Sequence, residues 1–270
     1  MDRAKFTVPM LAQRKATGDK LVMITVYDAT FARLADEAGV DLFLVGDSLG
    51  MVVQGHETTL NVTLDEMAYH CQLVARVKPR AMVVGDLPFG SYQASAEQAV
   101  KSAVKLVKAG AEAVKLEGGV SVADGVEAIT RADIPVIGHI GLTPQSVHRM
   151  GGHKVQGKQP GHNPGGRDRI VSDAKVLESA GACAVVLEGI PRDLAAEITR
   201  AIDIPTIGIG AGPDCDGQVL VLHDVLGLTD ARMKFVKQYA DLKDAVVGAI
   251  GTYADEVRTG AFPTDAHSFH

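Results

Sequence analysis

Carboxylates stand at the ends of several apolar runs in this sequence. Asp47 follows the run Leu42–Val45, and Asp86 and Glu117 end two later runs in the same way. A run that is apolar throughout is typical of a strand buried on both faces. An unpaired charge at the end of such a strand is costly, so we expect these acids to serve a site.

The three acids Asp47, Asp86 and Glu117 form a candidate metal site. Neighbouring carboxylates repel one another unless a cation lies between them, and an all-oxygen ligand set suits Mg²⁺ better than Zn²⁺. Lys115 is two residues before Glu117, so both side chains project from one face of their strand. The alternative is that the acids lie on the surface and cap helices, but an in-register lysine favours a shared site that binds an anion.

Two further strand ends carry groups that could move or hold a proton. Glu188 ends the run Ala184–Leu187 and is a candidate general base, because its strand is far from that of Asp47 in the strand order. His139 ends another run. It either contacts the substrate or only forms a hydrogen bond at the strand end, and both readings stay open.

The apolar runs alternate with amphipathic helical segments from end to end, which predicts a parallel sheet. An N-terminal helix is expected to start at Thr7–Pro9, to continue from Leu11 to Thr17 and to end at Gly18. About eight strands in this length predict a single (β/α)₈ TIM-type barrel over residues 1–270. The rival is an open doubly wound sheet, but polar groups end nearly every strand, and a barrel brings such ends to one mouth. The strand candidates are Leu21–Asp28, Leu42–Val45, Ala81–Asp86, Ala113–Glu117, Ile134–His139, Ala184–Glu188, Ile204–Ile209 and the weaker Met233–Val236.

Residues 151–167 break the alternation. They are rich in glycine and polar residues and have no apolar periodicity. Long irregular loops in compact domains commonly have a function, and this one follows a strand end at the expected mouth. The segment is therefore expected to form a mobile lid.

The composition excludes several classes of protein. The 270 residues are 46% hydrophobic, with net charge −6 and pI near 5.8. There is no basic run and no Trp, which argues against nucleic-acid binding. No apolar run is long enough to cross a membrane or to act as a signal sequence. The three distant cysteines indicate reduced thiols and a cytoplasmic protein.

Seven motifs resemble the ketopantoate hydroxymethyltransferase family, and the resemblance covers almost the whole chain. It implies a (β/α)₈ barrel that uses Mg²⁺ and takes 5,10-methylenetetrahydrofolate as co-substrate. The implied reaction transfers a hydroxymethyl group to 3-methyl-2-oxobutanoate and gives 2-dehydropantoate, the first step of pantothenate biosynthesis. The motifs are Val45–Met51, Val53–His56, Asp86–Phe89, Val114–Gly119, Gly138–Ser146, Val186–Glu188 and Ile207–Gly212.

The resemblance also implies roles for individual residues. Glu188 resembles the proton acceptor that forms a Mg²⁺-stabilised enolate. The family forms homo-oligomers, and a decamer is expected. The implied metal ligands are Asp47, Asp86 and Glu117, and the implied contacts to the 2-oxo acid are Asp47, Ser48, Asp86 and Lys115.

Two other functions fit parts of the pattern. A Mg²⁺-dependent lyase of the phosphoenolpyruvate mutase type would share the barrel, the metal and the enolate, but would not need folate. A non-catalytic protein that binds a 2-oxo acid would need neither a general base nor a metal. The presence of both a candidate base, Glu188, and an acid cluster suited to a metal argues against this second alternative.

Overall fold

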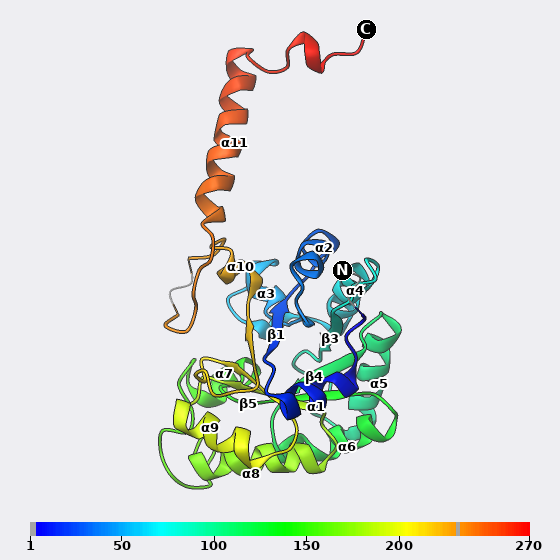
Figure 1. Ribbon diagram of the computed structural model, residues 1–270, viewed down its shortest axis with the longest axis vertical. Helices are drawn as coiled ribbons and strands as arrows, with labels where there is room; N and C mark the ends of the chain where they lie inside the picture. Colours follow the sequence, from blue (N-terminus) through cyan, green and yellow to red (C-terminus); the bar gives the residue numbers. More distant parts are fainter. Residues whose placement is uncertain (1–3, 231–232) are drawn as a thin grey trace. The chain divides into compact units, whose positions relative to one another are not determined.

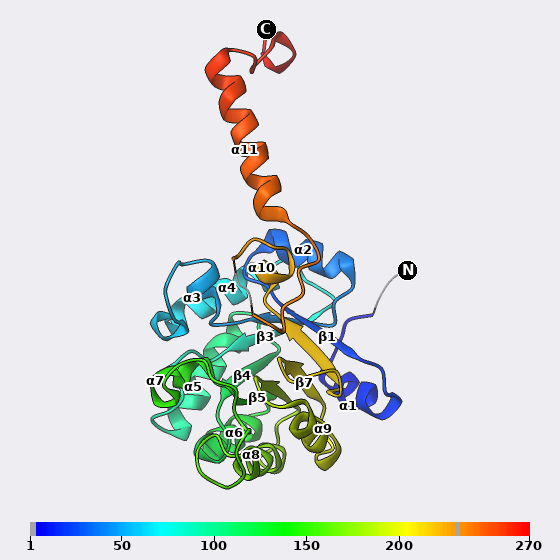
Figure 2. The same ribbon diagram turned by 90° about the vertical axis from the view of Figure 1, so that its left-hand side faces the viewer.

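The computed structural model describes residues 4–230 and 233–270. Its parallel strands pair in sequence order, and the last strand pairs with the first, so the sheet closes into a barrel (Figures 1 and 2). The predicted barrel is confirmed, and the open doubly wound sheet is wrong. The strands are β1 Leu21–Thr25, β2 Leu42–Val45, β3 Met82–Asp86, β4 Ala113–Glu117, β5 Val136–Gly141, β6 Ala184–Glu188, β7 Thr206–Ile209 and β8 Gly217–Leu220.

The helices follow the strands along the chain, and the predicted N-terminal helix is present as α1. In Figure 2, helices of the barrel unit surround its strands. The helices are α1 Val8–Thr17, α2 Ala29–Ala38, α3 Leu49–Val52, α4 Leu64–Ala75, α5 Ala96–Lys108, α6 Ala123–Arg131, α7 Val147–Met150, α8 Arg167–Ser179, α9 Arg192–Ala201, α10 Leu222–Val225 and α11 Leu242–Thr259.

The position of the eighth strand was predicted wrongly. The strand is β8 and not Met233–Val236, whose described backbone contains a turn. Two features hid β8 in the sequence. Gln218 is exposed, so the segment is not an apolar run. The first position of the strand, 217, requires a glycine, because a Cβ atom there would lie 2.6 Å from the carbonyl oxygen of Leu21.

The chain divides into two compact units, residues 1–221 and 222–270. All eight strands belong to the first unit. In the second unit, none of the residues of α11 is buried. Among the described helices, none has both the length and the apolar character needed to cross a bilayer. Whether residues 1–270 act as a single domain stays a prediction.

Alternate residues of the strands fill the interior of the barrel. Phe6 and Leu11 pack on this inner cluster, so the N-terminal segment and α1 cover the end at which the strands begin. The opposite faces of the same strands pack against the helices in a second cluster. The inner cluster contains, from the strands, Leu21, Met23, Leu42, Leu44, Met82, Val84, Ala113, Ile137, Ala184, Val186, Ile207 and Val219.

The alternation explains how the site residues are positioned. Asp86, Lys115, Glu117, His139 and Glu188 each lie two or four residues beyond a member of the inner cluster on the same strand. Successive side chains of a strand point to opposite faces, so all five project toward the interior at the carboxyl ends. Register brings Asp86 beside Lys115 and Glu117 beside His139.

The end of the barrel covered by α1 should depend on Leu11, which is 1% exposed. We predict that Leu11→Ala lowers the free energy of unfolding by about 2–5 kcal/mol, because it leaves a cavity against the inner cluster. Urea unfolding measures the change. The control Leu34→Ala alters a leucine that is 56% exposed and should change stability by less than about 0.5 kcal/mol. Equal effects of the two changes would contradict this role.

Candidate active site

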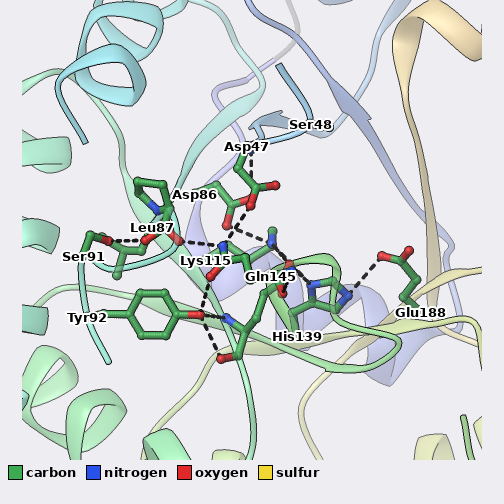
Figure 3. A network of polar contacts seen from close by, with 12 residues as sticks. Asp47, Ser48, Asp86, Leu87, Ser91, Tyr92, Lys115, His139, Gln145 and Glu188 are labelled. Carbon is green, nitrogen blue, oxygen red and sulfur yellow. Dashed lines mark hydrogen bonds and ion pairs between the residues drawn. The ribbon is translucent and has the colours of Figure 1, made fainter. Parts of the chain in front are cut away.

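The three acids predicted as metal ligands come together at the carboxyl ends of β2, β3 and β4. Figure 3 shows two of them, Asp47 and Asp86. Asp47, Asp86 and Glu117 are each at most 5% exposed. The backbone N–H of Asp47 donates to Oδ2 of Asp86 at 3.2 Å. A hydrogen bond to a buried carboxylate offsets part of the cost of its desolvation, so the turn after β2 helps to hold the acid that ends β3.

Lys115 lies among these acids. Its Nζ is 2.8 Å from Oδ1 of Asp86 and 3.9 Å from Oε1 of Glu117. Burial opposes a charge on the ammonium group, but the charges of Asp86, Glu117 and Asp47 outweigh it and raise the pKa of Lys115. The lysine therefore stays protonated and supplies a positive charge inside the mouth.

The single positive charge of Lys115 does not neutralise the negative charges of the three acids. Burial raises the pKa of Asp47 well above its usual value, and repulsion by Asp86 and Glu117 adds to the effect. Burial also raises the pKa of Asp86 despite its contact with Lys115. For Glu117, burial opposes the charge, but the contact with His139, the charge of Lys115 and the backbone N–H of Gln145 outweigh burial and lower the pKa. A further positive charge at this place would favour the ionised forms of Asp47 and Asp86.

His139 joins the acid cluster to Glu188. Its Nδ1 is 3.3 Å from Oε1 of Glu117, and its Nε2 is 3.1 Å from Oε2 of Glu188. Burial and the charge of Lys115 both oppose protonation, but the two carboxylates raise the pKa of His139 to about 9. The side chain of Glu188 is 18% exposed, against 1% for that of Asp86. Glu188 is thus the acid of this group that is most open to the mouth.

Ser48 begins the turn that leads into α3. Its hydroxyl lies 2.8 Å from the hydroxyl of Tyr27, which is 1% exposed and follows β1. The loop after β1 therefore fixes the position of a residue that follows β2. A substrate contact by Ser48 or by His139 stays a prediction.

Two residues of the site were missed by the sequence analysis. Gln145 donates from Nε2 to Oδ2 of Asp47 and from its backbone N–H to Oε2 of Glu117, both at 2.9 Å. The hydroxyl of Tyr92 is 2.7 Å from Oε1 of Gln145 and contacts the backbone of Glu117. Both residues lie in the connections that follow strands, Tyr92 after β3 and Gln145 in a short 3-10 helix after β5, so a search of strand ends does not find them. The signal available was that Gln145 falls within the motif Gly138–Ser146.

Of the expected lid, residues 151–167, residues 151–166 are irregular between α7 and α8, and Arg167 begins α8. The backbone N–H of Gln156 donates to the carbonyl oxygen of Gly189 at 2.9 Å, and that of Gly157 donates to Gly165 at 2.8 Å. The first of these bonds ties the segment to the residue that follows Glu188. The segment therefore lies beside the candidate base.

The donor atoms fit a hard cation, although the acids are not arranged as a closed metal cage. In the described part of the chain, no three His, Cys, Asp or Glu side chains already form such a cage. Oδ1 of Asp86 and Oε1 of Glu117 are buried without a hydrogen-bond partner, and their contacts are ion pairs with Lys115 and His139. Buried oxygens of this kind suit Mg²⁺ coordination.

Solved structures with the same fold support the architecture. Phosphonopyruvate hydrolase, solved with oxalate and Mg²⁺, has a TM-score of 0.62 at 15% identity and covers 96% of this chain and 92% of its own. A 2,3-dimethylmalate lyase of the PEP mutase/isocitrate lyase superfamily has a TM-score of 0.61 at 17% identity and covers 97% and 91%. At such identities the likeness extends to the fold alone.

Comparison of the amino-acid sequence with known proteins gives evidence on the family as well as on the fold. The 3-methyl-2-oxobutanoate hydroxymethyltransferase of Pelobacter propionicus is 53% identical over 270 residues, covering 99% of this chain and 98% of the relative. The enzyme of the same name from Geobacter sulfurreducens is 54% identical over 271 residues and covers both chains fully. The family model described as ketopantoate hydroxymethyltransferase matches residues 5–265. The predicted resemblance is thus confirmed, and the chain belongs to the ketopantoate hydroxymethyltransferase family.

Proposed function

We propose that this enzyme transfers a hydroxymethyl group from 5,10-methylenetetrahydrofolate to 3-methyl-2-oxobutanoate and produces 2-dehydropantoate for pantothenate biosynthesis. The relatives' names support the reaction. The observation that carries the proposal is the contact chain from the buried acids and Lys115 through His139 to Glu188. The cytoplasm, indicated by the cysteine pattern of the sequence, is the proposed compartment.

The metal in this proposal is Mg²⁺, held by Asp47, Asp86 and Glu117. Their oxygen donors, the two buried oxygens without hydrogen-bond partners and the raised pKa values of the two aspartates support a cation at this place. Phosphonopyruvate hydrolase uses the same fold and was solved with Mg²⁺ and oxalate. When bound, Mg²⁺ would polarise the keto group of the substrate and acidify its C3 hydrogen.

The protein's own groups supply the other parts of the reaction. The protonated Lys115 would pair with the carboxylate of the 2-oxo acid, and the hydroxyl of Ser48 would donate to it. Glu188 would accept the C3 proton, because it is the acid open to the mouth. His139 holds Oε2 of Glu188 and so fixes the direction of that carboxylate. The C3 carbon would then bond to the one-carbon unit of the folate. Both C–N bonds of that unit would break, one water would supply the hydroxyl oxygen, and tetrahydrofolate would leave.

A lyase of the phosphoenolpyruvate mutase type is the second candidate, because the solved neighbours include such enzymes. Those neighbours are 16–17% identical to this chain, whereas the hydroxymethyltransferases are 53–56% identical over nearly all of it. The comparison favours the transferase. Turnover that requires the folate separates the two functions.

We also propose that the enzyme works as a homo-oligomer, with the decamer as the expected form. Helix α11 supports an assembly, because Val247, Ile250 and Tyr253 are each more than half exposed. Exposed apolar patches of this kind commonly mark interaction sites. Sedimentation velocity tests the proposal: a decamer has ten times the 28.4 kDa mass of the chain, and a monomer would contradict it.

The metal assignment predicts that a chelator abolishes turnover and that added Mg²⁺ restores it. Asp86→Ala should weaken Mg²⁺ binding more than Lys115→Ala, because the aspartate would hold the cation and the lysine the anionic substrate. Calorimetric titration with Mg²⁺ measures both affinities. Full activity of the metal-free enzyme would contradict a role for the metal. Equal Mg²⁺ affinities in the two variants would contradict the assignment of Asp86 to the cation and Lys115 to the substrate.

The base assignment predicts that Glu188→Gln slows both C3–H exchange in D₂O and turnover by about 10²–10⁴-fold. Binding of Mg²⁺ and of the 2-oxo acid should change little, because the side chain keeps its size. Proton NMR follows the exchange in the absence of folate. If exchange persists while transfer fails, Glu188 serves the folate half of the reaction and not the enolisation.

The lid assignment predicts that limited proteolysis with trypsin cuts first within residues 151–167, after Lys154 or Lys158. Loops at a barrel mouth are exposed and mobile, and a bound substrate should slow the cut by holding the segment. Mass spectrometry of the fragments identifies the site. First cleavage elsewhere, at a rate that substrate does not alter, would contradict the lid.

A further inference from the structure

Gln145 contacts two of the three acids at once. It lies in the short 3-10 helix Pro144–Ser146 after β5 and is 6% exposed. Its Nε2 donates to Oδ2 of Asp47 at 2.9 Å and to the carbonyl oxygen of Leu87 at 3.0 Å. Its backbone N–H donates to Oε2 of Glu117 at 2.9 Å. One residue therefore links β2, the segment after β3, and β4 (Figure 3).

The orientation of the Gln145 amide follows from its partners. Both hydrogens of Nε2 have acceptors, and Oε1 lies 2.7 Å from the hydroxyl of Tyr92 and 3.3 Å from Nε2 of Gln93. A reversed amide would place its oxygen against the carboxylate of Asp47, which is repulsive. Tyr92 is 4% exposed, and its hydroxyl also contacts the backbone of Glu117. The amide is thus held from both sides.

We propose that Gln145 is a positioning residue that holds Asp47 and Glu117 in the arrangement that binds the metal. The inference rests on the proposed function, in which these acids are metal ligands. Gln145 binds one oxygen of each acid, and the other oxygen of Glu117, Oε1, has no hydrogen-bond partner. The side-chain amide of Gln145 holds Asp47 and its backbone N–H holds Glu117, and neither donor adds a positive charge that would repel the cation. Lys115 cannot do this, because its ammonium group is charged.

The test measures Mn²⁺ affinity in the absence of substrates, by electron paramagnetic resonance of the free ion. Gln145→Leu keeps much of the volume of the side chain and removes both Nε2 donors. We expect it to bind Mn²⁺ about 10–100-fold more weakly, the usual effect of losing a partner that orients a metal ligand. Gln145→Asn keeps the amide but is one methylene shorter, so it should lose affinity in the same direction. Gln93→Ala is the matched control, because it removes a contact to Oε1 of Gln145 and leaves the bond to Asp47 in place.

The outcomes separate this proposal from the proposed function. If the wild-type enzyme does not bind Mn²⁺, the metal site itself is wrong. If the wild type binds and both Gln145 variants bind equally well while folded, the positioning role is wrong. If Gln145→Leu does not fold, Gln145→Asn decides. A positioning role further predicts that saturating Mg²⁺ restores much of kcat in Gln145→Asn, whereas damage to the fold would not respond to the metal.

Discussion

The ion pair between Lys115 and Asp86 is the interaction on which the site depends. It lies at the end of a closed sheet, where the side chains of Lys115 and Asp86 are only 4% and 1% exposed. Removing one partner of a buried pair leaves an uncompensated charge and commonly costs about 3–5 kcal/mol. The pair tolerates this burial because Asp47 and Glu117 add negative charge around the ammonium group, and because Gln145 gives them neutral donors. The result is a negative pocket whose charge is only partly balanced, as a cation site requires.

Strands and loops contribute to this pocket in different ways. The strand residues Asp86, Lys115 and His139 are placed by the hydrogen-bonded register of the sheet, which the inner cluster keeps rigid. The loop residues Gln145 and Tyr92 are placed by their own buried hydrogen bonds. A site built from strand residues and loop residues together needs the hydrogen bonds of Gln145 and Tyr92, because a loop alone does not hold a side chain as firmly as a strand does.

The sequence predicted well which polar groups lie at the strand ends and predicted the connections poorly, for physical reasons. A strand buried on both faces is apolar throughout, so a polar residue at its end is conspicuous, as at Asp86 and Glu188. The same uniformity hides the period of two, so the sequence does not say which residues face inward. β8 was missed because Gln218 interrupts its apolar pattern. Gln145 was missed because its role depends on three partners that are distant in the sequence and meet only in the folded barrel.

The position of Phe6 and Leu11 has a consequence for access. Together with the inner cluster, these side chains fill the barrel from the end where the strands begin. Within the described residues, the buried acids can therefore be approached only from the opposite mouth. In the proposed reaction, a small 2-oxo acid and a bulky folate would share that single entrance. The filling of one end of the barrel therefore makes both substrates depend on the same route to the buried acids.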